Sequence, residues 1–493
     1  MSRFFLTLAG LILWASTSSA EDRPNVLVFL VDDLGVMDTS LNGEAEPFYE
    51  TPSLERLASE GVTFTNGYSA HARCVESRFA IQTGRSPWRD SAQTTPAGRA
   101  MLGHPTLGEA FLEGGYATAF FGKWHLGKEE AEFPHGRGYT VDVGGCHAGA
   151  VASHFFPFHL NPQTGKTGKE GPLLGLEDGV EGENVTDRLT REAAEWIRRH
   201  RNDHPDQPFF AFFSHFAVHT PIQGKPDEVA WFTKKAASLP PAFGEDGYLA
   251  ADGVTKTRRD HPVYASMVKT TDDSLGSMLD LLDELEITEE TIVLFTSDHG
   301  GLSNRGTTSK RELATSNLPY RAGKGHLYDG GLRVPFLVSW PGTIPEGEIS
   351  EAFAVGTDIF PTLTELAGVR SFPEHHVDGT SLAPALLDSD PMRERSGYFW
   401  HHPLPRPTQT GDQAMSVLRD GKFKLVKTYY PEVAFELYDL KVDPHETTNL
   451  AEEKPSRVRR MVAALEEHLT AGGAPPLRQD WKDKETVKPV TAR

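Results

Sequence analysis

Residues 25–31 read Asn-Val-Leu-Val-Phe-Leu-Val and are followed directly by two acids, Asp32 and Asp33. A continuous run of apolar and β-branched residues predicts a strand that is buried on both faces, as in a parallel sheet. The two carboxylates stand where this strand passes into a loop. In open α/β sheets, ligands bind at the carboxyl ends of the strands. The stretch therefore predicts a fold class and the edge of the sheet at which a site lies.

Four further apolar runs resemble the first, at residues 117–121, 209–213, 292–296 and 336–340. Between them lie segments with apolar residues at helical spacing, such as Leu189, Ala193, Trp196 and Ile197. Strands that alternate with helices predict an α/β layered fold. Polar pairs follow three of the later strands: Lys123 and His125, His215 and His219, and Asp298 and His299. We expect them to share one site with Asp32 and Asp33.

The 493-residue chain is acidic, with a formal net charge of −20. Nucleic-acid binding requires a basic face, so this composition argues against it. Arg3, the apolar residues 4–15 and the small residues up to Ala20 predict a signal peptide that is cleaved near Ala20. We therefore expect a secreted or periplasmic protein. The apolar run is shorter than the ~20 residues of a spanning helix, so we expect no stable membrane association.

Residues 21–390 are predicted to form the catalytic domain, and the sequence pattern changes after them. Residues 414–430 read as a hairpin with the turn Asp420-Gly421. A further strand is predicted at 435–440 and a helix at 456–469. These elements predict a small α+β unit over residues 391–475, and residues 476–493 read as a loose tail.

Two groups of side chains carry chemistry. The first is rich in oxygen and suits a hard divalent cation such as Ca²⁺ or Mg²⁺, while its one imidazole leaves room for Mn²⁺ or Zn²⁺; it consists of Asp32, Asp33, Asp298 and His299. The second would bind a compact oxyanion; it consists of Arg78, Lys123, His125, His219 and Lys324. Taken singly, these residues also fit turns and solvated surface charges, and it is the grouping that favours a site.

These residues lie in segments that resemble the formylglycine-dependent (type I) sulfatase family, in particular its arylsulfatase A-like and carbohydrate sulfatase members. The resemblance runs from about Pro24 to Asn449. Its segments are residues 31–35, Cys74-Val-Glu-Ser-Arg78, 115–125, His219-Thr-Pro221, 297–301, 324–335, 358–362 and 437–440. The resemblance implies the alkaline-phosphatase-like fold, a mostly parallel mixed sheet between helices, with a smaller C-terminal α+β domain.

The resemblance also implies a reaction on sulfate esters. A separate formylglycine-generating enzyme would oxidise Cys74 to formylglycine, whose aldehyde hydrates to a diol. One hydroxyl would attack sulfur and release the alcohol, and the second would then lose its proton and expel sulfate. The implied metal is Ca²⁺, with Mg²⁺ or Mn²⁺ as less favoured alternatives. Its implied ligands are Asp32, Asp33, residue 74, Asp298 and His299.

The remaining roles follow the same resemblance. His125 would act as the base for sulfate release, and His219 and Lys324 would bind sulfate and help to protonate the leaving oxygen. Arg78 and Lys123 would orient the diol. The implied substrate is a sulfated carbohydrate. Its candidate contacts are Ser153, Arg321 and His326, although Arg321 and His326, like Arg305, also fit an ordinary loop.

The sequence departs from the family pattern at two positions. Glu76 stands where the family signature has Pro, and His299 stands where many members have Asn. Two alternatives to a sulfatase therefore remain. One is a phosphoester hydrolase of the same superfamily, and the other is a sulfoglycan-binding protein in which Cys74 stays a thiol.

Overall fold

The computed structural model describes residues 23–89, 97–161, 165–168, 173–387, 395 and 397–477. The predicted signal peptide, the boundary at residue 390 and nearly all of the predicted tail lie outside these residues. No helix among the described residues is long and apolar enough to cross a membrane.

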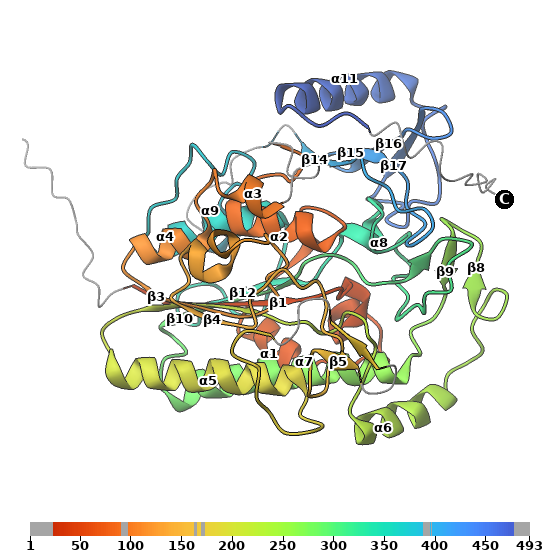
Figure 1. Ribbon diagram of the computed structural model, residues 1–493. Helices are drawn as coiled ribbons and strands as arrows, with labels where there is room; N and C mark the ends of the chain where they lie inside the picture. The colour runs from red at the N-terminus through yellow and green to blue at the C-terminus, as the bar shows by residue number, and fades with distance from the viewer. Residues whose placement is uncertain are drawn as a thin grey trace, which may run out of the picture.

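A mixed eight-stranded sheet forms the centre of the fold (Figure 1). Its central strands run parallel, whereas β12 is antiparallel to both of its neighbours. In spatial order the strands are β13 (Glu348–Val355), β2 (Gly61–Tyr68), β12 (Phe336–Ser339), β10 (Thr291–Ser297), β1 (Asn25–Val31), β7 (Phe209–Ser214), β3 (Ala117–Gly122) and β4 (Val141–Val143). All five predicted strands are present in this sheet, and the predicted α/β class is confirmed.

Helices cover both faces of the sheet, which explains why β1 is apolar throughout. Leu27, Phe29 and Val31 pack into one core cluster, and Val26 and Val28 pack into the other. The first face is covered by α1 (Pro52–Ser59), α5 (Val185–Asp203), α6 (Pro226–Ala237) and α7 (Pro262–Glu284). The second is covered by α2 (Cys74–Thr83), α3 (Ala97–Met101), α4 (Leu107–Glu113) and α9 (Ile359–Leu366).

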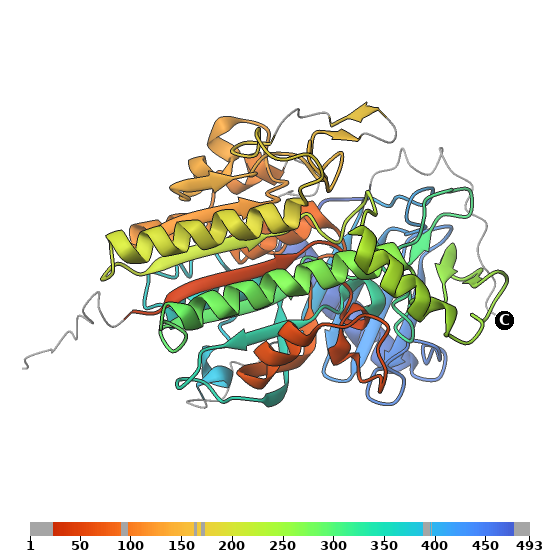
Figure 2. The same ribbon diagram turned by 90° about the horizontal axis from the view of Figure 1, so that it is seen from below.

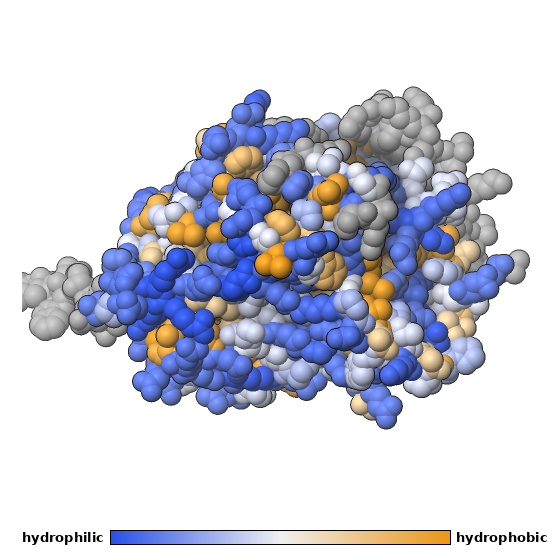
Figure 3. Space-filling model, turned by 60° about the horizontal axis from the view of Figure 1, so that its bottom comes forward, coloured by the Kyte–Doolittle hydropathy of each residue, from blue (hydrophilic) through white to orange (hydrophobic). Residues whose placement is uncertain are grey.

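The long helices α5 and α7 run side by side across the first face (Figure 2). The surface of this side is largely hydrophilic, with apolar residues in small separate groups (Figure 3). Two short helices lie in connecting segments. Helix α8 (Asp329–Leu332) precedes β12, and helix α10 (Ala383–Leu386) follows α9.

An antiparallel four-stranded sheet forms the C-terminal part of the chain. Its strands are β14 (Tyr398–His402), β15 (Met415–Asp420), β16 (Phe423–Thr428) and β17 (Ala434–Asp439), in that order. Helix α11 (Pro455–Ala471) packs its apolar side chains on this sheet. The predicted hairpin is confirmed, because β15 and β16 pair across Asp420 and Phe423. The α+β character expected for this part of the chain is likewise confirmed.

Two small sheets were not predicted from the sequence. One joins β8 (Tyr248–Leu249), β9 (Val254–Lys256) and β11 (Asn304–Arg305), and the other joins β5 (Leu160–Asn161) and β6 (Lys166–Thr167). Their strands have only two or three residues, which is too short for a recognisable alternation of apolar and polar positions.

Candidate active site

Three strands of the large sheet deliver polar side chains to one edge. Asp32 follows β1, Asp298 follows β10, and these two strands pair in parallel up to Val31 and Ser297. Lys123 follows β3, and its ammonium group reaches Asp32 Oδ2 at 2.5 Å. The expectation that carboxyl strand ends bring these side chains together is therefore met.

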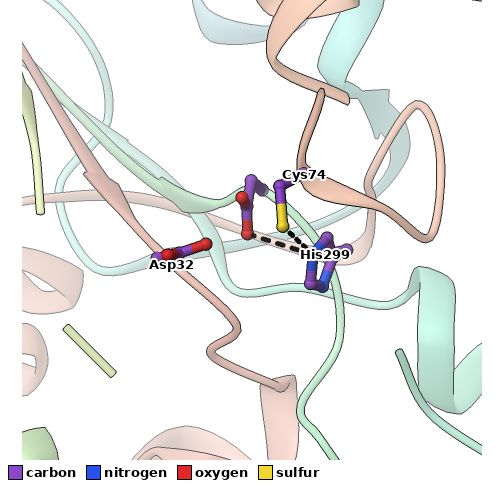
Figure 4. Close-up of side chains that lie close together, drawn as sticks. Asp32, Cys74 and His299 are labelled. Carbon is purple, nitrogen blue, oxygen red and sulfur yellow. Dashed lines mark hydrogen bonds and ion pairs between the residues drawn. The ribbon is translucent and has the colours of Figure 1, made fainter. Parts of the chain in front are cut away.

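Cys74 is the first residue of α2 and enters this group from above the sheet edge (Figure 4). Its Sγ lies 3.2 Å from His299 Nε2 and 4.0 Å from Asp33 Oδ1. Lys324 Nζ lies 3.6 Å from the same sulfur atom. Because Cys74 is buried, these side chains rather than water define the environment of its thiol.

Two overlapping groups of donor atoms could hold a metal ion. Asp32, Cys74, Asp298 and His299 each place one ligand atom within 4.8 Å of the others, and Asp33 and Cys74 do the same with His219. Asp32 Oδ1 is buried without a hydrogen-bond partner, and its nearest cation, Arg78 Nη2, lies 3.4 Å away. A buried carboxylate oxygen without a partner is costly, and a hard cation would satisfy it. The donor set therefore fits the metal that the sequence predicts.

Each acid at the centre also faces a buried cation. Lys324 Nζ donates to both oxygens of Asp33, at 2.6 and 2.7 Å. Arg78 Nε donates to Asp298 Oδ2 at 3.0 Å. Removing paired charges from water is costly, and breaking such a pair leaves an uncompensated charge. These cations consequently have fixed positions around the reactive centre.

Backbone and hydroxyl groups hold Arg78 in place. Its Nη1 donates to the carbonyl oxygen of Lys123 and to Ser214 Oγ, both at 2.7 Å. Sequence reasoning missed Ser214, which is the last residue of β7. The available signal was a single hydroxyl that ends an otherwise apolar run.

The surrounding charges act on the thiol and on His299. Burial alone would raise the pKa of Cys74, but Lys123, Lys324 and His299 together hold it well below its usual value. Burial opposes protonation of His299, whereas Asp298, Cys74 and Asp33 raise its pKa to about 9. The charges around residue 74 thus favour the anionic form of its thiol.

Two further imidazoles border the centre. His125 hydrogen-bonds Cys74 and has a φ of 59°, while its Nδ1 is buried without a partner. A side chain at Gly149 would place its Cβ 2.4 Å from His125 Nε2, so only glycine leaves room for this ring. His219 Nδ1 lies 2.8 Å from the Thr220 carbonyl oxygen, and its Nε2 lies 3.9 Å from Asp33.

His215 does not join the site, contrary to the expectation from its place after β7. Its ring packs on Phe29 and Phe213, and its Nε2 contacts Ser274 Oγ on α7 at 3.2 Å. Burial lowers its pKa to about 3. Because side chains alternate along an extended chain, this histidine points into the core beneath the first face of the sheet.

The three predicted substrate contacts are all held by protein groups. Ser153 Oγ accepts from the amide of Phe155, and the neighbouring His154 contacts the carbonyl oxygen of His219. His326 Nε2 lies 3.1 Å from the Thr410 carbonyl oxygen. Arg321 makes a two-point ion pair with Asp252.

The fold and these side chains together define a hydrolase of anionic esters. A family model described as "Sulfatase" matches residues 24–369. A second model, described as "N-sulphoglucosamine sulphohydrolase, C-terminal", matches residues 322–472. The chain belongs to the sulfatase family and is a sulfuric ester hydrolase.

Named relatives agree with this assignment. The chain is 32% identical to human N-acetylgalactosamine-6-sulfatase, over 78% of its own length and 69% of the relative. It is 28% identical to a sulfatase of Formosa agariphila, over 92% and 89% of the two chains. Among solved structures, that of Ps i-CgsB in complex with k-i-k-neocarrahexaose has a TM-score of 0.73 at 25% identity, covering 90% of this chain and 92% of that one.

Proposed function

We propose that this protein removes sulfate from a carbohydrate sulfate ester, with residue 74 converted to formylglycine beside a bound divalent cation, Ca²⁺ in the first place. The observation that carries the proposal is the convergence of Cys74 with three carboxylates, His299 and three buried cations at one sheet edge. The names of the relatives support a sugar substrate, since one acts on an N-acetylgalactosamine sulfate and another was solved with a neocarrahexaose.

The cation would be held by Asp32, Asp33, Asp298 and His299 together with residue 74. It would supply a fixed positive charge for one sulfate oxygen and make the nucleophilic hydroxyl more acidic. All of these side chains are buried, so the ligands are already in place before the cation binds.

The cationic side chains would orient the sulfate group. Lys123 and Lys324 both favour negative charge on the Cys74 thiol, so the same ammonium groups would face the sulfate group at residue 74. Fixed cations aimed at developing negative charge lower the barrier without reorganising during the reaction. Arg78, anchored at Ser214 and Lys123, would keep the Asp298 carboxylate in its ligand position.

Two histidines and Lys324 suit the proton transfers. Burial lowers the pKa of both His125 and His219, which favours the neutral form of each ring. His125 lies against residue 74 and would take the proton that leaves the diol. The proton for the leaving alcohol would come from Lys324, because Asp33, Cys74 and Asp32 raise its pKa against the effect of burial. His219, whose side chain is 15% exposed, would bind the leaving oxygen beside it.

Paired aryl sulfate and aryl phosphate esters test the reaction class. The proposal expects kcat/KM for the sulfate to exceed that for the phosphate by at least about a hundredfold. A higher value for the phosphate would instead favour the phosphoester hydrolase. A panel of monosulfated sugars would then identify the substrate. We further propose that the protein is secreted or periplasmic and meets the maturation enzyme before it folds.

A further inference from the structure

The segment that carries Lys324 has little regular structure of its own. We call residues 321–333 the Lys324 segment; within it only α8 is helical. Lys324 Nζ reaches Asp33, and the amide of Gly325 donates to the carbonyl oxygen of Ala72, two residues before Cys74. The amide of Lys324 also donates to the carbonyl oxygen of Gly301 at 3.0 Å, so the middle of the segment is held beside the active site, and other contacts hold its two ends.

The first end is held by strand β17 of the C-terminal sheet. Arg321 Nη1 donates to Tyr438 Oη at 2.9 Å and lies 3.3 Å from Glu436 Oε2. The Arg321 guanidinium lies over the ring of Tyr328, 3.7 Å from its centroid. Tyr328 Oη in turn donates to Glu436 Oε2 at 2.8 Å. Glu436 thus binds the segment at two residues, one on each side of Lys324.

The second end is held by a buried group of charges. The amide of Asp329, the first residue of α8, donates to Glu446 Oε2 at 2.7 Å. Lys424 Nζ lies 2.7 Å from Asp329 Oδ1 and 2.7 Å from Glu446 Oε1. Arg333 Nε donates to Asp329 Oδ2 at 2.8 Å. We call Asp329, Arg333, Lys424 and Glu446 the interface cluster.

Arg321 also pairs with Asp252, and Asp329 accepts from Tyr68 Oη on β2; the other partners at both ends come from the C-terminal sheet and the loop that follows it. Lys424 lies on β16, Glu436 and Tyr438 lie on β17, and Glu446 follows β17. Figure 1 shows α8 beside these strands, between them and the large sheet. Sequence alone singled out residues 324–335 and 437–440 without connecting them.

We infer that the C-terminal sheet positions Lys324 in the active site, with Glu436 and Glu446 as the positioning residues. This inference rests on the proposed function for the role of Lys324, but not for the contacts themselves. We call the contacts of Glu436 and Glu446 with the Lys324 segment the clamp. Arg321 is then part of the clamp and not a residue that binds the sugar substrate. Neither glutamate contacts Cys74 or the side chains that could bind a metal ion. Each would therefore affect the active site only through the Lys324 segment.

The same contacts could instead contribute only to overall stability, and the two readings differ in what a substitution changes. A positioning contact keeps Lys324 at the sulfate, so its loss should lower kcat more than it raises KM for the sugar. A misplacement of about 1 Å can cost up to ~10²-fold in rate. A purely stabilising contact would lower the melting temperature and leave the kinetics of the folded enzyme unchanged.

The test uses the full-length, mature protein with Glu436→Ala, and Glu446→Gln as a second variant that keeps an acceptor for the Asp329 amide. Glu466→Gln is the matched control, because Glu466 pairs with Lys427 on the same sheet at 2.8 Å. Hydrogen exchange of peptides that cover residues 321–333 is measured beside kcat and KM on an aryl sulfate. Thermal unfolding is recorded for all four proteins.

We expect exchange in the Lys324 segment to rise at least about tenfold in Glu436→Ala, with other core peptides unchanged. kcat should fall about tenfold or more in that variant, while Glu466→Gln matches the wild type. Unchanged exchange in the segment, or an increase spread evenly over the chain, overturns the inference. If the wild type hydrolyses no sulfate ester, the proposed function fails, and the exchange result still decides whether the clamp exists.

Discussion

The active site and the interface cluster are both buried groups of charges, yet they differ in how the charges are arranged. In the interface cluster, Lys424 stands between two carboxylates, each 2.7 Å away. In the active site, carboxylate, thiol and imidazole atoms of different residues converge within 4.8 Å of one another. Buried charge alone therefore does not mark a functional centre. The active site differs because several potential ligand atoms crowd together, and a bound cation would relieve their repulsion. The Lys324 segment connects the two regions.

The largest effect should come from Cys74→Ala, which removes the atom that the active site surrounds. We expect kcat/KM on a sulfate ester to fall at least ~1000-fold, as for loss of a nucleophile. Circular dichroism should stay unchanged. The control is Cys146→Ala, since Cys146 belongs to neither donor group, and it should keep most of the activity. Substantial turnover by Cys74→Ala would show that the reaction does not pass through residue 74.

Metal removal should separate the two charge clusters. A chelator should abolish activity and lower the melting temperature, because the active-site carboxylates then repel each other without a cation. Calcium at 100 times its Kd should restore about 2.7 kcal/mol of unfolding free energy. Asp298→Asn should show no such calcium-dependent gain. Full activity after chelation, in protein shown to contain no residual metal, would argue against a resident cation.

Lys424→Met should destabilise the protein without any change at the metal ligands. It leaves Asp329 and Glu446 facing each other in a buried position, where loss of one partner costs about 3–5 kcal/mol. Denaturant unfolding measures this loss. The calcium-dependent stabilisation should persist in the variant, because its ligands are untouched. A loss below ~1 kcal/mol would mean that the interface cluster is less important than its burial suggests.

The smallest effect on stability should come from Glu76→Pro, which restores the family signature. Residue 76 lies in the first turn of α2, where backbone amides have no partner within the helix, so we expect a change of about 1 kcal/mol or less. The charge of Glu76 acts on Arg73 and His402, and it is not among the largest influences on the Cys74 thiol. We therefore expect the variant to alter only the fraction of residue 74 that is converted, as peptide mass spectrometry would measure it.

The strands and the site edge could be predicted because they are encoded locally. Runs such as residues 25–31 are long and apolar, and the acids that follow them mark where each strand ends. Asp32, Lys123 and Asp298 were grouped correctly for that reason. His215 was not, because its position after β7 does not show which face of the sheet its side chain points to.

The clamp on Lys324 could not be predicted because its contacts are distant in sequence. Arg321 reads as a free loop arginine until Glu436, 115 residues later, is placed beside it. Likewise, nothing near Glu446 indicates that its carboxylate caps the amide of Asp329. Such pairs are formed by the docking of one sheet against another and leave no periodic signal in the chain.

The mass of the peptide that contains residue 74, measured in catalytically active protein, tests the central claim most directly. The protein should be produced with a formylglycine-generating enzyme present, and its sulfate-ester turnover should be recorded on the same preparation. We predict that residue 74 carries the aldehyde in a fraction that rises and falls with the specific activity. Active protein in which residue 74 is entirely the unmodified thiol would contradict the account.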